Sequence, residues 1–259
     1  MSISFEAVLW LQVSGYAVVC VVGMLWLRSH NYHMNWLHQP DKFQETIPPR
    51  SLAWTRAARH FFLFSAAVVV VGRIDVVLVS RLADNKTAGI YVAGARLAQV
   101  AFLVTVAVNT VLYPRISQAW ARKDYAAIKQ LIHKSLVFTG AISVIEVLIA
   151  ALFASYIVEL FGPAYSASAP VFKVMVLAFA LWGIPAPIYA FLLMTGREKT
   201  LAIICWIILA ANLGAMFVFV PIMGADGGAI AMCFGYGIVL PMLIFLWWSV
   251  QRGNALKSE

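Results

Sequence analysis

The chain has 259 residues, of which 63% are hydrophobic and only 12% are charged, and its formal net charge is +8. Soluble domains carry about 25% charged residues, so the composition excludes an ordinary soluble protein and indicates a polytopic membrane protein. The basic residues are spread over separate connecting segments, which is typical of membrane topology. We therefore expect no nucleic acid among its partners.

Seven stretches are long and apolar enough to cross a bilayer core of about 30 Å as helices. None shows the ten-residue alternation of a membrane barrel, so the predicted fold class is an all-α polytopic membrane protein with seven transmembrane helices. Three cysteines lie singly in apolar segments and are expected to be small core residues: Cys20, Cys205 and Cys233. In chain order the spans cover residues 7–27, 61–79, 88–112, 136–160, 170–194, 201–223 and 227–250.

The two longest connections are predicted to lie at the membrane surface. Residues 28–60 mix aromatic and polar side chains, and their histidines at 30, 33 and 38 have a metal-compatible spacing that no Cys or acidic residue completes. We therefore expect no metal site and no other cofactor. Residues 113–135 carry apolar side chains three and four positions apart among basic ones, which predicts a separate interfacial amphipathic helix. The short segment 224–228 predicts a tight turn, and Gly235 and Gly237 predict close helix packing.

The distribution of Lys and Arg predicts the orientation. The first, third and fifth connections and the tail hold 14 of them, whereas the second, fourth and sixth connections hold two. The C-terminus is therefore predicted to be cytoplasmic and, with seven spans, the N-terminus outside. An outside N-terminus and the lack of an internal repeat lead us to expect one half of a larger assembly.

Three charged residues lie deep inside the second and third spans, where a charge costs at least a few kcal/mol. Asp75 and Arg96 have similar depths in antiparallel helices and can pair, whereas Arg73 is about 200° around the helix from Asp75. We expect Arg73 to point into a cavity and attract an anionic group, with Asp75 and Arg96 as its neighbours in a substrate site. An open alternative is that these three residues and Glu146 form one neutral network that fixes helix register.

Glu146 lies alone near the middle of the fourth span. Such a carboxylate can carry a proton and couple transport to the proton gradient; pairing with Arg73 or Arg96 is the alternative. In the fifth span Gly183, Pro185 and Pro187 predict a helix break that serves as a hinge. No nucleophile elbow or phosphate-binding loop is present, so an enzyme is not expected.

Six motifs follow one another along the chain: GRID at 72–75, AGIYVAGARL at 88–97, LYPRIS at 112–117, LFGPAY at 160–165, TGREK at 195–199 and GADGGAIA at 224–231. In this order they resemble the C-terminal half of polysaccharide biosynthesis proteins. These are the lipid-linked oligosaccharide (O-antigen type) flippases of the multidrug/oligosaccharidyl-lipid/polysaccharide exporter superfamily.

The resemblance implies two six-helix lobes that work by alternating access. Residues 1–27 would match the last helix of an N-terminal lobe, 28–60 a cytoplasmic linker, 61–250 the C-terminal lobe and 251–259 a cytoplasmic tail. An N-terminal lobe or a partner chain would complete the cavity, and membrane lipids are further expected partners.

The implied substrate is an oligosaccharide on an undecaprenyl diphosphate carrier in the bacterial cytoplasmic (inner) membrane, as in lipopolysaccharide biosynthesis. Two rivals remain open. A drug or metabolite exporter of the same superfamily would show cavity carboxylates or aromatic cages. A non-transporting membrane scaffold would show fully paired arginines and no cavity.

Overall fold

The computed structural model describes residues 62–252, and within them the chain is helical with no strand. An all-α polytopic membrane protein is therefore confirmed. The predicted first span (7–27), the linker (28–60) and the tail beyond 252 lie outside the described residues. Five helices in the described part are long and apolar enough to cross a membrane.

The first membrane passage, Phe62–Leu82, is interrupted near its middle. Residues 62–71 are helical, the chain turns at Gly72 and Arg73, and α3 (Ile74–Leu82) follows. Asp84 then caps α4 (Asn85–Ala121), because its carboxylate accepts a hydrogen bond from the backbone N–H of Thr87 at 2.8 Å. The polar break predicted between the second and third spans lies here.

α4 and α5 form a long helical hairpin. α4 runs to Ala121, and α5 (Tyr125–Glu159) begins after a turn in which Lys123 has a φ of 55° and Asp124 caps the new helix. The separate interfacial helix predicted for residues 113–135 is therefore wrong. Its apolar side chains continue the inner faces of the two helices, and Ile116, Ile128 and Ile132 are fully buried in the bundle.

The fifth predicted span is broken at the proline pair. After a short 3-10 helix (Pro163–Ser168), α6 (Ala169–Gly183) ends where α7 (Ala186–Met194) begins. Pro187 has no N–H to donate to the carbonyl of Gly183, one turn back. The predicted break is confirmed.

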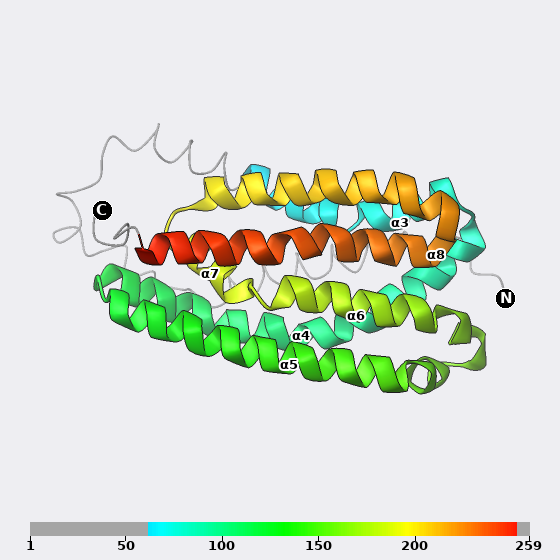
Figure 1. The fold of residues 1–259 in the computed structure, drawn as a ribbon, viewed down its shortest axis with the longest axis horizontal. Coiled ribbons are helices and arrows are strands. Elements are labelled where there is room, and N and C mark those ends of the chain that lie inside the picture. The colour runs from blue at the N-terminus through cyan, green and yellow to red at the C-terminus, as the bar shows by residue number, and fades with distance from the viewer. Residues whose placement is uncertain (1–61, 253–259) are drawn as a thin grey trace, which may run out of the picture. The chain divides into compact units, whose positions relative to one another are not determined.

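α8 (Glu198–Arg252) contains two arms that fold back on each other at Gly224, as Figure 1 shows. Gly224 has φ 58° and ψ −126°, the angles of the first central residue of a type II′ turn, where glycine is favoured. A side chain at Gly235 would overlap the Asn212 amide on the other arm, so the predicted close packing there is confirmed. Gly237 has only an ordinary contact with Leu181.

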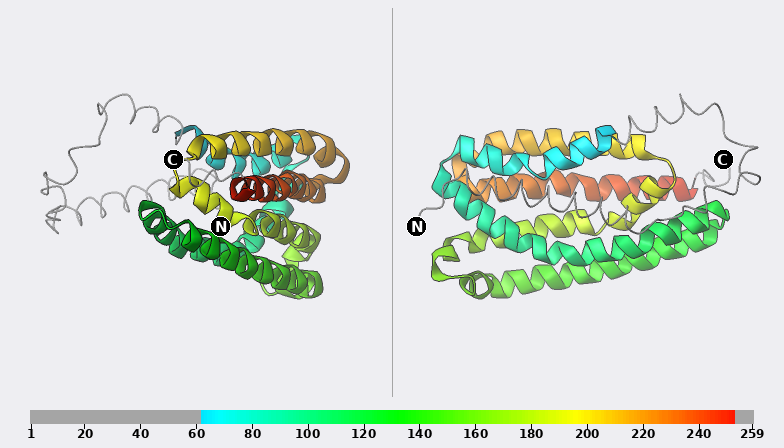
Figure 2. Two further views of the ribbon diagram at one scale, coloured as in Figure 1. Left: turned by 60° about the vertical axis from the view of Figure 1, so that its left-hand side comes forward. Right: turned by 180° about the vertical axis from the view of Figure 1, so that it is seen from behind.

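α6 lies at the centre of the packed helices and contacts α4, α5 and α8. The views in Figure 2 show α4 and α5 side by side near the turn that joins them, and the N-terminal part of α4 leaning away from α5. The core is apolar and includes the fully buried Met175, Ile188 and Phe191. Outer positions are also apolar, with Leu152 75% exposed and Ile222 76% exposed, as a lipid-facing surface requires.

Candidate functional site

The buried carboxylate of Asp75 is bound by a tyrosine and not by an arginine. The Tyr91 hydroxyl on α4 donates to Asp75 Oδ2 on α3 at 2.8 Å, and both side chains are buried. Among residues 62–252 the other oxygen, Oδ1, is buried without a hydrogen-bond partner. Burial of a polar atom without a partner costs free energy.

Arg96 does not take the predicted position beside Asp75. Its side chain is exposed, and its guanidinium donates to Gln99 Oε1 on the same helix at 2.9 Å. Positions 91 and 96 are about 140° apart around a helix, so α4 can turn only one of them toward α3. Arg96 and Asp75 have similar depths, which made their pairing possible. The rotation of α4 about its axis turns Tyr91 toward Asp75 instead.

Arg73 lies at the turn between the two helical parts of the first passage and is exposed. Within residues 62–252 no ion pair joins it to Asp75 or Glu146. The alternative of one neutral network of four charged residues is therefore wrong for the described part of the chain. Its neighbour Gly72 lines a cavity, described below.

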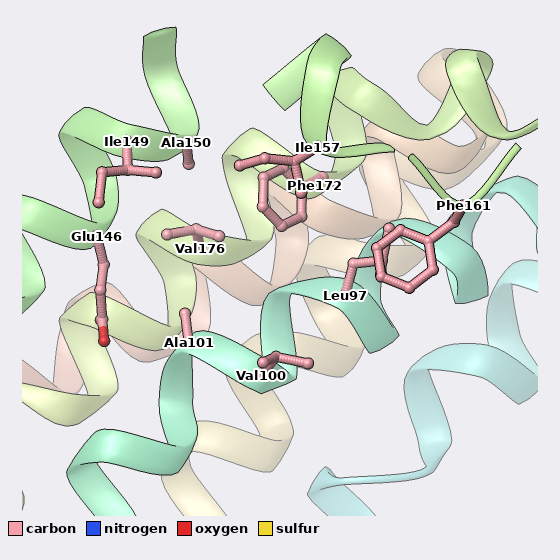
Figure 3. Close-up of a pocket in the computed structure, with 10 residues that line it drawn as sticks. All are labelled: Leu97, Val100, Ala101, Glu146, Ile149, Ala150, Ile157, Phe161, Phe172 and Val176. Carbon is pink, nitrogen blue, oxygen red and sulfur yellow. The ribbon is translucent and has the colours of Figure 1, made fainter. Parts of the chain in front are cut away.

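Glu146 lies at one edge of an apolar pocket of about 270 Å³ between α4, α5 and α6, and Phe161 lies at the opposite edge in Figure 3. Its Oε1 is buried and has no hydrogen-bond partner among residues 62–252, although the residue as a whole is half-buried. The predicted alternative pairing with Arg73 or Arg96 is not found. Glu146 is the only ionisable residue among those lining this pocket.

A second cavity, which we name the Trp182 hollow, lies beside the helix break and has a volume of about 210 Å³. Trp182, Ala186 and Tyr189 from the two sides of the break line it. α4 contributes Asn109, Thr110 and Tyr113, and within the described part of the chain Asn109 Oδ1 is buried without a hydrogen-bond partner. The main lining residues are Phe102, Asn109, Thr110, Tyr113, Trp182 and Tyr189.

Aromatic rings connect the Trp182 hollow to the Asp75 region. Trp182 contacts Tyr189 at 5.8 Å and Tyr236 at 5.2 Å between ring centroids. A smaller cavity of about 140 Å³ shares Trp182 with the hollow and is also lined by Gly72 and Tyr236. The interior between the first passage, α4, α6 and α8 thus holds two adjoining cavities, and one of them reaches Gly72, three residues before Asp75.

Two threonines, one on α4 and one on α5, contact the helix break between α6 and α7. The Thr139 hydroxyl on α5 lies 3.2 Å from the carbonyl of Ile184 at the break, and it shares its single hydrogen between this carbonyl and the closer carbonyl of Ser135 at 2.8 Å. Gly183 packs so closely against Thr105 on α4 that an added Cβ would lie 2.8 Å from Thr105 Oγ1. The helix break at Gly183, Pro185 and Pro187 is therefore packed against α4 and α5, and it lies beside the Trp182 hollow.

Comparison with known families gives two matches. The MatE family matches residues 62–220, and the family described as polysaccharide biosynthesis protein matches residues 1–120. The fold and these matches define a membrane exporter of the multidrug/oligosaccharidyl-lipid/polysaccharide superfamily. The chain belongs to the MatE family. No curated protein and no solved structure matched it.

Sequence reasoning singled out the charged residues and missed their surroundings. Tyr91, Asn109, Trp182 and Tyr236 were not predicted as site residues. A buried tyrosine in an apolar helix needs a hydrogen-bond partner, so Tyr91 carried a usable signal. Among the described residues no cluster could hold a metal ion, and the three linker histidines lie outside them.

Proposed function

We propose that the protein takes part in moving a polyprenyl-diphosphate-linked oligosaccharide across the bacterial cytoplasmic membrane by alternating access. The observation that carries the proposal is the Trp182 hollow. It combines aromatic faces with an unpartnered amide, and such faces and hydrogen-bonding groups suit the apolar and hydroxyl sides of sugars. The family membership supports an exporter, and the match to polysaccharide biosynthesis proteins favours a saccharide substrate.

The carrier diphosphate would be bound by arginine. Arg73 is exposed beside the smaller cavity and has no acidic partner in the described chain. A planar guanidinium binds phosphate oxygens bidentately. Arg96, also exposed and bonded to Gln99 alone among the described residues, is available as a second cation.

Asp75 suits the coupling role better than Glu146. Asp75 is 6% exposed with one unpartnered oxygen, whereas Glu146 is half-buried at an outer pocket. Uptake of a proton or a cation at Asp75 would change its bond to Tyr91 and so the packing of α3 on α4. The helix break at Gly183, Pro185 and Pro187 would absorb the resulting movement.

A second lobe, on the same polypeptide or on a partner chain, would face Arg73. An exposed arginine at membrane depth requires water or a protein partner, and lipid provides neither. This lobe would close the substrate cavity with the described helices. The C-terminus would be cytoplasmic and the N-terminus outside.

The experiment is complementation of a bacterial strain that lacks its lipid-linked oligosaccharide flippase, with the protein level measured by immunoblot. We expect Arg73→Gln and Trp182→Leu to abolish surface polysaccharide at normal protein level, because each removes one recognition group. The matched controls, Arg81→Gln and Trp206→Leu, change exposed residues outside the hollow and should complement fully. Full complementation by both site variants would refute the proposal, and loss of folded protein in Arg73→Gln would assign that residue to structure.

A multidrug exporter is the second candidate, and Glu146 is the observation that favours it. A lone carboxylate at the edge of an apolar pocket that Phe161 and Phe172 also line suits a lipophilic cation. Under this alternative, cells expressing the protein would extrude a cationic dye, and Glu146→Gln would stop the extrusion. A scaffold is less favoured, since the described part has cavities and Arg73 is not paired.

A further inference from the structure

An open groove runs along the α4–α5 hairpin, away from the Trp182 hollow. Its volume is about 660 Å³. We name it the hairpin groove and define it by six of its lining residues, Val104, Val108, Val111 and Arg115 from α4 and Lys134 and Phe138 from α5. The residues from α4 repeat at intervals of three and four, so they form one continuous stripe along the helix.

The length of the groove matches one leaflet of a membrane. Val104 and Arg115 are eleven positions apart, which corresponds to about 16 Å along a helix. Half of a bilayer core of about 30 Å is close to this length. An occupant lying along the stripe would therefore stay within a single leaflet.

The charges of the groove are confined to one end. Arg115 and Lys134 are both exposed and lie on the side of the α4–α5 turn, and no acidic residue lines the groove. Neither cation has an ion-pair partner within residues 62–252. The opposite end, at Val104 and Phe138, is apolar. The groove is thus complementary to a molecule with an anionic end and an apolar shaft.

We propose that the hairpin groove is a binding site for one anionic phospholipid of the leaflet nearest the α4–α5 turn. One acyl chain lies against the valine stripe and Phe138, and the phosphate lies between Arg115 and Lys134. This site is separate from the proposed transport site and does not depend on the identity of the substrate. The lipid fills a groove between α4 and α5. Alternating access would require these two helices to move together.

The test is native mass spectrometry of the full chain purified in detergent, with phosphatidylglycerol and phosphatidylcholine of identical acyl chains as probes. We expect phosphatidylglycerol to bind more tightly by about 30-fold, the effect of two cations near a membrane surface. The double variant Arg115→Gln/Lys134→Gln should reduce this preference to less than about 3-fold. Lys129→Gln, which changes an exposed α5 lysine outside the groove, should leave it unchanged.

A third variant tests the groove separately from the charge. Val108→Trp fills the stripe without altering any charge, and should weaken the binding of both lipids; circular dichroism and the unfolding temperature verify its fold. If Lys129→Gln reduced the preference for phosphatidylglycerol as much as the double variant does, the preference would come from general surface charge. That result would overturn the proposal. Three other results would also overturn the proposal. They are unchanged lipid binding by Val108→Trp, displacement of phosphatidylglycerol by equimolar undecaprenyl phosphate, and a lipid-free dimer whose interface covers the groove.

Discussion

Asp75 and Tyr91 show how a buried charge in this protein is accommodated. Among the described residues the carboxylate has one hydrogen-bond donor, at 2.8 Å, and one oxygen without a partner. Its hydrogen bonding there therefore depends on a single hydroxyl. Within an apolar bundle, removal of a sole donor leaves a buried acceptor unsatisfied. The residue is therefore a sensitive point for stability and for any coupling step.

Tyr91→Phe removes that hydroxyl and keeps the ring. We expect a loss of about 1–2 kcal/mol in unfolding free energy, because Asp75 loses its donor in a buried setting. Denaturant titration in mixed micelles measures it. Tyr156→Phe is the control, since Tyr156 is 66% exposed; an equal loss in both variants would contradict the assignment.

Gly183 is the second residue whose neighbour decides the effect of a substitution. We expect Gly183→Ala to cost about 1–3 kcal/mol, because the new Cβ would press on Thr105 Oγ1. Adding Thr105→Ala should restore most of the loss, which a double-mutant cycle measures as coupling.

Gly140→Ala is the matched control for this cycle. Nothing lies within 4 Å of a Cβ at Gly140, so the substitution should leave stability unchanged or raise it by about 0.5–1 kcal/mol. Strict additivity of Gly183→Ala and Thr105→Ala would show that the two positions do not press on each other.

At the scale of elements, the start of α4 depends on a titratable cap. Asp84 accepts bonds from the Thr87 N–H at 2.8 Å and the Thr87 hydroxyl at 3.0 Å. These bonds lower the pKa of Asp84 below its ordinary value of 3.8. A carboxyl whose pKa is lowered on folding stabilises the fold above its ordinary pKa, and this contribution disappears as the pH falls through the lowered value.

Asp84→Ala should therefore lower the unfolding temperature at pH 7, and the difference from the parent should shrink below pH 3.8. Asp84→Asn keeps a side-chain acceptor and should lose less, without the change in acid. Thermal scans in detergent across this range make the comparison. If the unfolding temperatures of Asp84→Ala and the parent differed by the same amount in acid as at pH 7, the ionised cap could not be the source of the difference.

The helix break and the long hairpin differ in how well local sequence predicts them. A proline pair acts on its own backbone, so the end of α6 at Gly183 and the start of α7 at Ala186 follow from residues nearby. The apolar spacing of 113–135 suits both an interfacial helix and the ends of two packed helices. Burial of Ile116 and Ile132 selects the second, and burial depends on the rest of the bundle.

At the scale of the whole molecule, the orientation in the membrane is the main open prediction. α4 has 37 residues and is about 55 Å long, which exceeds the bilayer core, so we expect its two ends on opposite sides of the membrane. The Lys and Arg distribution predicts that the Arg122 end is cytoplasmic.

Single cysteines test this orientation after Cys20, Cys205 and Cys233 are replaced by serine. Asn85→Cys should react with a membrane-impermeant maleimide in intact cells, whereas Arg122→Cys should react only after lysis. Both positions are exposed, so accessibility within the protein is matched. Labelling of Arg122→Cys in intact cells would reverse the predicted topology.

Hydropathy, proline and glycine act on nearby backbone, so the amino-acid sequence alone indicated membrane residence, the apolar cores of the helical passages, the break at residues 183–187 and the turn at Gly224. It also identified which charges are unusual. It did not predict where α4 ends and α5 begins. Only the tertiary structure decided which groups meet: Tyr91 and not Arg96 at Asp75, Thr105 at Gly183, and Trp182 with Tyr236 at the cavities. The physical reason is that each helix can rotate about its axis without changing its hydropathy, and that rotation is set by side-chain packing between distant segments.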